Sequence, residues 1–347
     1  MRVLLISNMY PKEGSHSGIF IKHQVETIEK LGIHVTKAVK TTRNPLGYFP
    51  FIFQSIYKLL FCDYDIIHAH YVPHSAFVPA MLKWIKKKPL IVTFHGTDAR
   101  IFPFKNKINR MLTMFVVNRS DKVIARSEEM KEVLEKLGVS NKKIVVIGAG
   151  VDTNFFHPID KNKAIEDFEL PKTKYIILFV GRLHKLKGVE LIYECARNMP
   201  ETLFVMVGDG DVKTDLKNCI FIGEKKHEEI PFWMSAADIL ILPSYSEGLP
   251  NVVMEALSCE TPAIVTDVGG CPEVVKDSET GFVVPVGDVK ALMDRIKYLL
   301  EDEDLRVKMG KLGREDMIKK YDRKKVIGKL KEVYESLEPL ESPTTMP

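Results

Sequence analysis

Two glutamates eight residues apart, Glu247 and Glu255, are the strongest candidates for chemistry in this sequence. Glu247 lies in a Gly/Pro turn directly after an apolar run typical of a buried strand. Glu255 lies within a helix that we expect to begin near Pro250, because proline is favoured in a first helical turn. The free N–H groups of such a turn attract anions or hydroxyls. The two carboxylates could therefore hold two polar groups of one ligand, although a capping glutamate and a surface glutamate would give the same spacing.

Three basic residues crowd the turn 181–188, which follows another apolar run. Arginine presents a planar fork to phosphate oxygens and lysine presents a point charge, so Arg182 and Lys187 could hold a diphosphate. The turn lacks the G-x-x-x-x-G-K-[ST] spacing of a P-loop. We therefore expect a diphosphate clamp made of these two side chains; the alternative is a basic loop that contacts nothing.

The first half of the chain carries a smaller set of candidates, centred on His95 and Asp98. His95 could donate a hydrogen bond to a reacting group or hold a sugar hydroxyl. His68 and His70 share one strand face and could suggest a metal site, but no further spacing matches a known ligand set, so we expect no metal. Glycines in the loop 14–18 would let the backbone approach a phosphate.

Each candidate follows a predicted strand, and most precede a predicted helix. Apolar runs and amphipathic segments alternate along the chain, which is typical of parallel sheets with helices on both faces. The predicted strands span 2–7, 34–39, 66–70, 90–94, 122–125 and 143–147, then 175–180, 203–207, 239–242, 263–266 and 282–284. In open parallel sheets, ligands bind outside the carboxyl ends of the strands.

The length of 347 residues suits two domains of ordinary size, both doubly wound and Rossmann-like. We expect one domain over residues 1–158 and a second over 159–330. Residues 156–158 and the polar stretch 160–169 read as the linker, and residues 331–347 as a helix end and tail. Two such domains facing each other would form a cleft with ligand loops on both walls.

Charge divides unevenly between the halves, with a net of +11 over residues 1–158 and −7 over the remainder. The basic half also carries aromatic runs at 48–53 and 56–61, and Trp84 precedes three consecutive lysines. Basic residues beside exposed aromatics favour an anionic membrane surface, whereas ordinary core helices with solvated basic faces are the alternative. No helix-turn-helix, RNP or zinc-finger pattern supports nucleic acid as a partner.

No stretch of 18 apolar residues occurs, and the N-terminal segment reads as a first strand rather than a signal peptide. The five cysteines are scattered and form no C-x-x-C pair, which argues against a disulfide framework or a zinc ribbon. We therefore expect a cytoplasmic protein that could associate peripherally with the membrane face.

The ordered set of motifs resembles the family 4 glycosyltransferases, which are retaining enzymes of the GT-B fold. The matching segments run along nearly the whole chain and include 10–18, 68–70, 95–98, 150–158, 181–188, 247–255 and 269–281. The resemblance implies transfer of a hexose from a nucleotide diphosphate sugar to a glycan or lipid-linked acceptor. It also implies that no metal or other cofactor is needed, and it leaves the base open between UDP, GDP and ADP.

The resemblance also implies a role for each candidate residue. Arg182 and Lys187 would hold the diphosphate, Glu255 would accept hydrogen bonds from the ribose, and Glu247 would position the donor sugar beside the anomeric carbon. The remaining donor contacts would come from Gly18, Gly248, Leu249, Pro250, Asn251 and Val252. In the first domain, His95 would lie near the donor sugar as a catalytic residue, together with Glu247, Arg182 and Lys187 of the second, whereas Asp98 and His16 would lie on the acceptor side.

Two departures from the family pattern concern the donor loops. Ser17 and Gly18 stand where many members have two glycines, and Leu249, Pro250 and Asn251 stand where many have an aromatic and a glycine. Pro250 removes a backbone donor that could bind a sugar hydroxyl. Two other functions remain open at this stage: a nucleotide-sugar epimerase, which needs no acceptor, and a two-lobed sugar-binding protein without chemistry.

Overall fold

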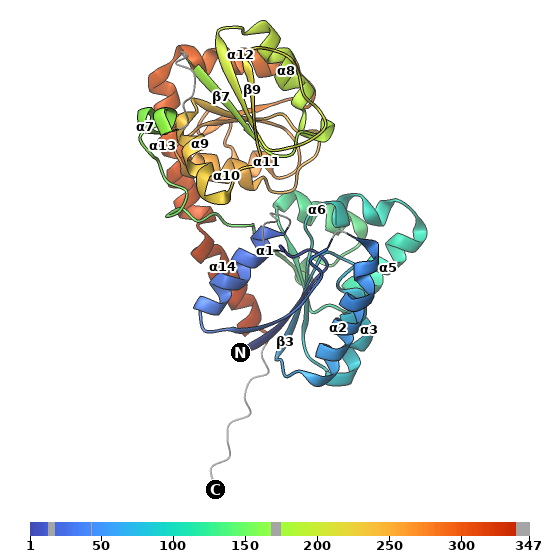
Figure 1. The fold of residues 1–347 in the computed structure, drawn as a ribbon. Helices are drawn as coiled ribbons and strands as arrows, with labels where there is room; N and C mark the ends of the chain where they lie inside the picture. Colours follow the sequence, from blue (N-terminus) through green and yellow to red (C-terminus); the bar gives the residue numbers. More distant parts are fainter. Residues whose placement is uncertain (13–17, 43, 168–174, 338–347) are drawn as a thin grey trace. The chain divides into compact units, whose positions relative to one another are not determined.

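The computed structural model describes residues 1–12, 18–42, 44–167 and 175–337 (Figure 1). The chain forms two compact units. The first unit comprises Met1–Gly148 and the C-terminal helix from Val326 onward, and the second comprises Ala149–Lys325. Residues 149–158 belong to the second unit because Val151 pairs with the segment before that helix, accepting from the N–H of Arg323 and donating to Tyr321.

The first unit is built on a six-stranded parallel sheet with the order β2-β1-β3-β4-β5-β6. Its strands are β1 (Arg2–Ser7), β2 (His34–Val39), β3 (Ile66–His70), β4 (Leu90–Thr93), β5 (Lys122–Ala125) and β6 (Ile144–Val146). All six strands follow the sequence prediction within a residue at each end. The apolar runs are continuous because both faces of the sheet are buried.

Helices cover both faces of this sheet. One face carries α2 (Tyr48–Phe61), α3 (Phe77–Lys86), α5 (Lys107–Arg119) and α6 (Glu128–Leu137), and the other carries α1 (Ile19–Lys30) and α14 (Arg323–Glu335). The short elements are η1 (Pro45–Gly47), α4 (Thr97–Arg100), η2 (Phe102–Phe104) and η3 (Asn141–Lys143). Alternate residues of each strand supply the two cores: Leu4 and Ile6 face α2, whereas Val3 and Leu5 face α1.

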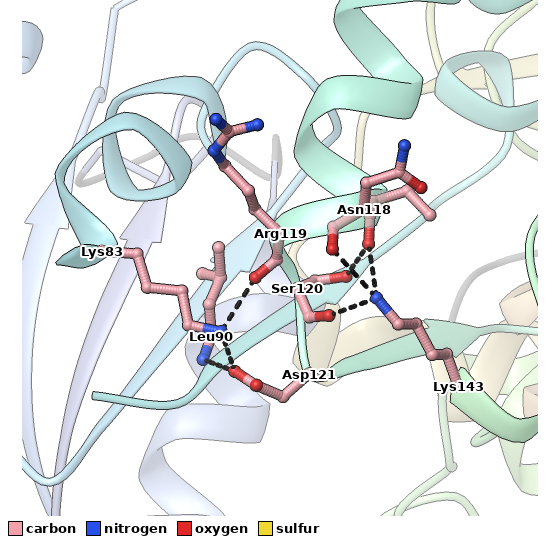
Figure 2. Close-up of polar contacts among 8 residues, drawn as sticks. Lys83, Leu90, Asn118, Arg119, Ser120, Asp121 and Lys143 are labelled. Carbon is pink, nitrogen blue, oxygen red and sulfur yellow. Dashed lines mark hydrogen bonds and ion pairs between the residues drawn. The ribbon is translucent and has the colours of Figure 1, made fainter. Parts of the chain in front are cut away.

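A polar cluster ties α3, β4, η3 and the end of α5 together in the first unit (Figure 2). The carboxylate of Asp121 accepts from Lys83 Nζ on α3 at 2.6 Å and from the N–H of Leu90 at 2.7 Å. Lys143 donates to the carbonyl oxygens of Val117, Asn118 and Ser120, which end α5. Lys83 and Lys143 are therefore engaged within the fold.

The second unit repeats the architecture with a six-stranded parallel sheet in the order β12-β11-β10-β7-β8-β9. Its strands are β7 (Tyr175–Val180), β8 (Thr202–Val207), β9 (Cys219–Gly223), β10 (Ile239–Leu242), β11 (Ala263–Thr266) and β12 (Gly281–Val284). The sequence prediction missed β9, an edge strand with a single neighbour and only one fully buried residue. The other five strands match within a residue.

The helices of this unit also lie on two faces. α8 (Val189–Asn198) packs against α12 (Val289–Glu301), whereas α10 (Asn251–Ser258) packs against α9 (Ile230–Ala236) and α13 (Glu303–Asp316). The remaining elements are η4 (Lys185–Lys187), η5 (His227–Glu229), α11 (Cys271–Val274) and the π-helical turn η6 (Met317–Tyr321). The two sheets and their helices make the chain an α/β protein with two doubly wound units, as the sequence predicted.

The prediction of a linker at 160–169 was wrong for residues 161–167. Lys161–Asp167 forms a helix, α7, which packs against α9 and buries Ala164 in the second core. Its Lys161 forms an ion pair with the buried carboxylate of Asp238 at 2.6 Å. A polar segment of seven residues with one buried alanine has too weak a periodicity to be recognised as a helix. Residues 168 and 169 lie outside the described part of the chain.

Candidate functional site

The loops that leave the carboxyl ends of β7, β8, β10 and β11 touch one another through glycines. A Cβ atom on Gly208 would lie 2.0 Å from the carbonyl oxygen of Gly181, and one on Gly269 would lie 2.2 Å from that of Glu247. Gly188 is in the left-handed region, with φ 68°, and its Cβ would lie 1.9 Å from the carbonyl oxygen of Pro243. These contacts bring both predicted donor motifs to one edge of the second sheet.

We expect Gly188→Ala to destabilise the protein by about 2 kcal/mol or more, because it adds a left-handed strain and a backbone clash. Thermal or urea unfolding measures the loss. Gly328→Ala in α14 is the matched control: apart from its chain neighbours and the nearby backbone of its own helix, no described atom lies within 4 Å of its Cβ position, and alanine there should stabilise the helix by up to about 1 kcal/mol. Equal stabilities for the two variants would contradict the close approach.

Lys187 and Glu247 meet at this edge although they are sixty residues apart in sequence. Lys187 Nζ lies 2.7 Å from Oε1 of Glu247, whose side chain is only 9% exposed. The hydroxyl of Ser244 donates to the same oxygen at 2.6 Å. One carboxylate oxygen is thus held from two sides, which leaves Oε2 as the atom of Glu247 that a ligand can use.

Arg182 is exposed, and its guanidinium makes no hydrogen bond or ion pair with any other described residue. Its loop is nevertheless fixed, since the next residue, Leu183, bonds with Asp209 and bridges to Gly210. Lys185 in the same loop pairs with Glu190. Arg182 is therefore the basic residue of this turn whose charged group is most available to an incoming anion.

The helix α10 begins at Asn251 as the sequence predicted, with Pro250 at its N-cap. The N–H groups of Asn251 and Val252 find no acceptor among the described residues, and the buried Oδ1 of Asn251 has no partner there either. Gly248 accepts from the N–H of Gly270 at 2.7 Å. Leu249 and Val252 pack against the core of the unit.

Glu255 lies on the second turn of α10 and is half-buried. Burial raises the pKa of its carboxyl from 4.5 to about 7, and the charge of Arg323 partly opposes that shift. No other described cation lowers this pKa. A carboxylate in such a place gains much from a ligand that donates hydrogen bonds to it.

In the first unit, His95 lies in a cluster of buried rings at the carboxyl edge of the sheet. His95 Nε2 is 3.0 Å from Nδ1 of His70, and its ring stacks on Tyr71 with centroids 4.2 Å apart. Burial lowers the pKa of both histidines well below the usual value, with nearby Arg126 adding to the effect. Both are therefore neutral at pH 7.

The carboxylate of Asp98 is bonded to the backbone of its own loop and of the loop that follows β3. Its carboxylate accepts from the N–H groups of His95, Gly96 and Val72 at 2.8 to 3.2 Å. Burial raises the pKa of Asp98 to about 6, against the opposing effect of these three donors. Its structural role is to fix the loop that presents His95.

Gly18 caps α1 with φ 80°, and a Cβ there would lie 2.9 Å from the carbonyl oxygen of Met9. This left-handed conformation suits glycine, and the predicted role of Gly18 in donor binding stays a prediction. The other predicted residue of that loop, His16, lies outside the described residues.

Sequence reasoning missed Arg126 and Ser244, which follow β5 and β10. Arg126 is only 7% exposed and forms no ion pair with the described residues. Its guanidinium lies 6.0 Å from the ring centroid of Phe20. Burial lowers its pKa to about 10, so it stays charged at neutral pH. Both residues occupy the strand-end position that identified the other candidates, and that signal could have found them.

The family models match both units of the chain. Residues 160–316 match the model described as glycosyl transferases group 1, and residues 3–155 match that of glycosyltransferase family 4. An uncharacterized glycosyltransferase of Methanocaldococcus jannaschii is 31% identical over 283 residues, which cover 79% of this chain and 76% of that protein. The chain belongs to the family 4 glycosyltransferases.

One further relative of this glycosyltransferase and one solved structure extend the comparison. The UDP-Gal:alpha-D-GlcNAc-diphosphoundecaprenol alpha-1,3-galactosyltransferase of Escherichia coli is 28% identical over 304 residues, covering 81% of this chain and 78% of that one. The Anabaena protein HepE, solved in complex with UDP-glucose, superposes with a TM-score of 0.81 at 20% identity and covers 97% of this chain and all of its own. The second likeness is one of fold.

Proposed function

We propose that this enzyme transfers a hexose from a nucleotide diphosphate sugar to a glycan or lipid-linked acceptor, with retention of anomeric configuration and without a metal ion. The observation that carries the proposal is the Lys187–Glu247 pair beside the unpartnered Arg182. It sets two cations and one oriented carboxylate at the carboxyl edge of the second sheet, where ligands of such sheets bind.

Glycosyl transfer builds negative charge on the leaving diphosphate and positive charge on the sugar ring. Fixed cations aimed at the leaving group are the largest electrostatic aid to such a reaction. Arg182 and Lys187 would supply it, in the part that a divalent ion plays in other enzymes. Glu247 Oε2 would position the sugar, and Glu255 would accept hydrogen bonds from the ribose. No further cofactor is needed for these steps.

The neutral imidazole of His95 would hold a hydroxyl of the donor sugar near the anomeric carbon. Because Asp98 fixes the backbone on either side of it, His95 is preorganised for this contact. Arg126 extends the same edge and adds a positive charge on the acceptor side.

Two of the compared proteins guide the choice of substrates to test. HepE was solved with UDP-glucose, and the E. coli relative uses a UDP sugar and a diphosphoundecaprenol-linked acceptor. UDP is therefore our first proposal for the nucleotide, with GDP and ADP as the alternatives. A lipid-linked acceptor would place the enzyme at the cytoplasmic membrane face as a peripheral protein, which the basic charge of residues 1–158 favours.

The test combines donor binding with stereochemistry. A panel of UDP, GDP and ADP sugars is screened by thermal shift, and the product of the best donor is analysed by NMR for its anomeric configuration. We expect transfer with retention, unchanged by a chelator. Inversion, or loss of turnover with the chelator, would contradict the mechanism. Conversion of the donor into an epimeric nucleotide sugar without any acceptor would favour an epimerase, and binding without turnover on any acceptor would favour a binding protein.

A further inference from the structure

The outward face of α2 is apolar. Phe49, Phe53, Tyr57 and Phe61 recur every four residues along one side of the helix, and each is 60–71% exposed. The opposite side of the helix, which packs on the sheet, has three buried residues, and one of them is a serine, Ser55. An ordinary surface helix has the reverse arrangement, with its polar side chains outward. The sequence alternative of core helices with solvated basic faces was therefore wrong for these aromatics.

Neighbouring helices continue this surface. α3 packs against both α2 and α5, and the three lie side by side on one face of the sheet (Figure 1). Trp84 on α3 is 73% exposed and Ile108 on α5 is 64% exposed. We define the aromatic face as Phe49, Phe53, Tyr57, Phe61, Trp84 and Ile108. Exposed apolar patches of this kind mark sites of interaction with a protein or a membrane.

The charges around the aromatic face are almost all of one sign. Residues 44–62 and 76–119 contain a single carboxylate, Asp98, and that one is buried. Lys87, Lys105 and Lys107 are exposed and form no ion pair with any residue that the structure describes. Asp63, two residues after Phe61, is exposed but pairs with Arg2. Exposed aromatic side chains on helices that carry unpaired lysines match the interface of an anionic bilayer, where Trp and Tyr are enriched and lysines meet lipid phosphates.

Other lysines of this region have a different task. Lys83 is bound to Asp121, as Figure 2 shows, and Lys86 donates to the carbonyl oxygen of Cys62 while lying over the ring of Tyr64. Both side chains anchor α3 and so hold Trp84 at the surface. No helix within the described residues is both long and apolar enough to cross a bilayer. The contact that we infer is therefore one of surface docking.

We propose that the aromatic face docks on the surface of an anionic lipid bilayer, with its rings at the level of the headgroups and with Lys87, Lys105 and Lys107 against lipid phosphates. The biological purpose of this docking rests on the proposed function, since docking would bring a lipid-linked acceptor to the enzyme. The docking itself requires no turnover and can be measured without a donor or an acceptor.

Trp84 is a built-in probe of the docking. The chain has two tryptophans, and the other, Trp233, is 2% exposed in the second unit. The full chain is mixed with vesicles of phosphatidylcholine alone or with added phosphatidylglycerol, at low and high salt. We expect flotation with the anionic vesicles only, at low salt. A blue shift of emission and protection from a soluble quencher should accompany it, and both should vanish in Trp84→Phe.

Two variants separate the apolar and electrostatic parts. Phe53→Ser with Phe61→Ser should weaken vesicle binding at least about tenfold, and so should Lys105→Glu with Lys107→Glu. Tyr298→Ser, which removes a half-exposed ring from α12 of the second unit, should leave binding unchanged. All variants should keep the wild-type melting temperature and the thermal shift with nucleotides, which makes loss of docking distinct from loss of donor binding.

Three results would overturn the proposal. The first is full recovery of the protein in the soluble layer with anionic vesicles at low salt. The second is flotation with unchanged Trp84 emission, because the chain would then bind through another surface. The third is a dimer in the absence of lipid that the Phe53 and Phe61 substitutions abolish, because the aromatic face would then be covered by a second copy of the chain.

Discussion

Arg182→Ala should lower kcat/KM for sugar transfer by about 10²–10³-fold and leave the melting temperature unchanged, because the guanidinium supports the leaving diphosphate and nothing else. The Arg182 side chain is exposed and bonds to no other described residue, so its removal breaks no hydrogen bond or ion pair in the described fold. Steady-state kinetics with the best donor of the panel measures the loss. Arg182→Lys should recover part of the activity, since a point charge replaces the planar fork.

Lys185→Ala is the matched control, because Lys185 lies in the same loop, is equally basic and pairs with Glu190 instead of facing a ligand. It should change kcat/KM by less than about twofold, the scale of a surface ion pair. If Lys185→Ala lost as much activity as Arg182→Ala, the loop would act through its overall charge and not through a positioned cation. Full activity of Arg182→Ala would refute the clamp.

The repeated strand and helix pattern was enough to predict eleven of the twelve described strands and the carboxyl-edge positions of the donor motifs. Buried parallel strands are continuous apolar runs, and such runs are read directly from the sequence. β9 escaped because an edge strand buries little. α7 escaped because its helical period has one buried position, Ala164. In both cases tertiary packing decides the structure, and the local sequence carries too little information about that packing.

The site shows the same limit for side-chain contacts. That Glu247 and Arg182 lie at strand ends follows from the sequence, whereas the bond between Lys187 and Glu247 depends on how β7 and β10 lie next to each other. Likewise, the sequence of α2 predicts a helix with aromatic residues along one side, but it does not predict which side of that helix faces the sheet. Only the buried position of Ser55 and the exposure of Phe53 settle that orientation.

Glu255→Gln should weaken nucleotide binding by about 10–100-fold above pH 7, the loss expected for hydrogen bonds to a charged acceptor. The pH dependence identifies the role. With a pKa of about 7, the free carboxyl is ionised only as the pH rises through that value, so wild-type affinity should strengthen across this range. Binding by the amide variant should be flat. Calorimetric titration at a series of pH values measures both curves.

Stability provides an independent check on the same carboxyl, with the opposite trend. Between the unfolded pKa of 4.5 and the folded value of about 7, the folded chain binds more protons through Glu255 than the unfolded chain does. Its stability contribution therefore falls as the pH rises over this interval and is constant above it. Glutamine does not titrate and so has no such loss. The melting temperature of Glu255→Gln, compared with that of the wild type at the same pH, should therefore rise from pH 4.5 to 7. A variant that weakened binding equally at every pH, with no such gain, would show that Glu255 shapes α10 without accepting a ligand's hydrogen bonds.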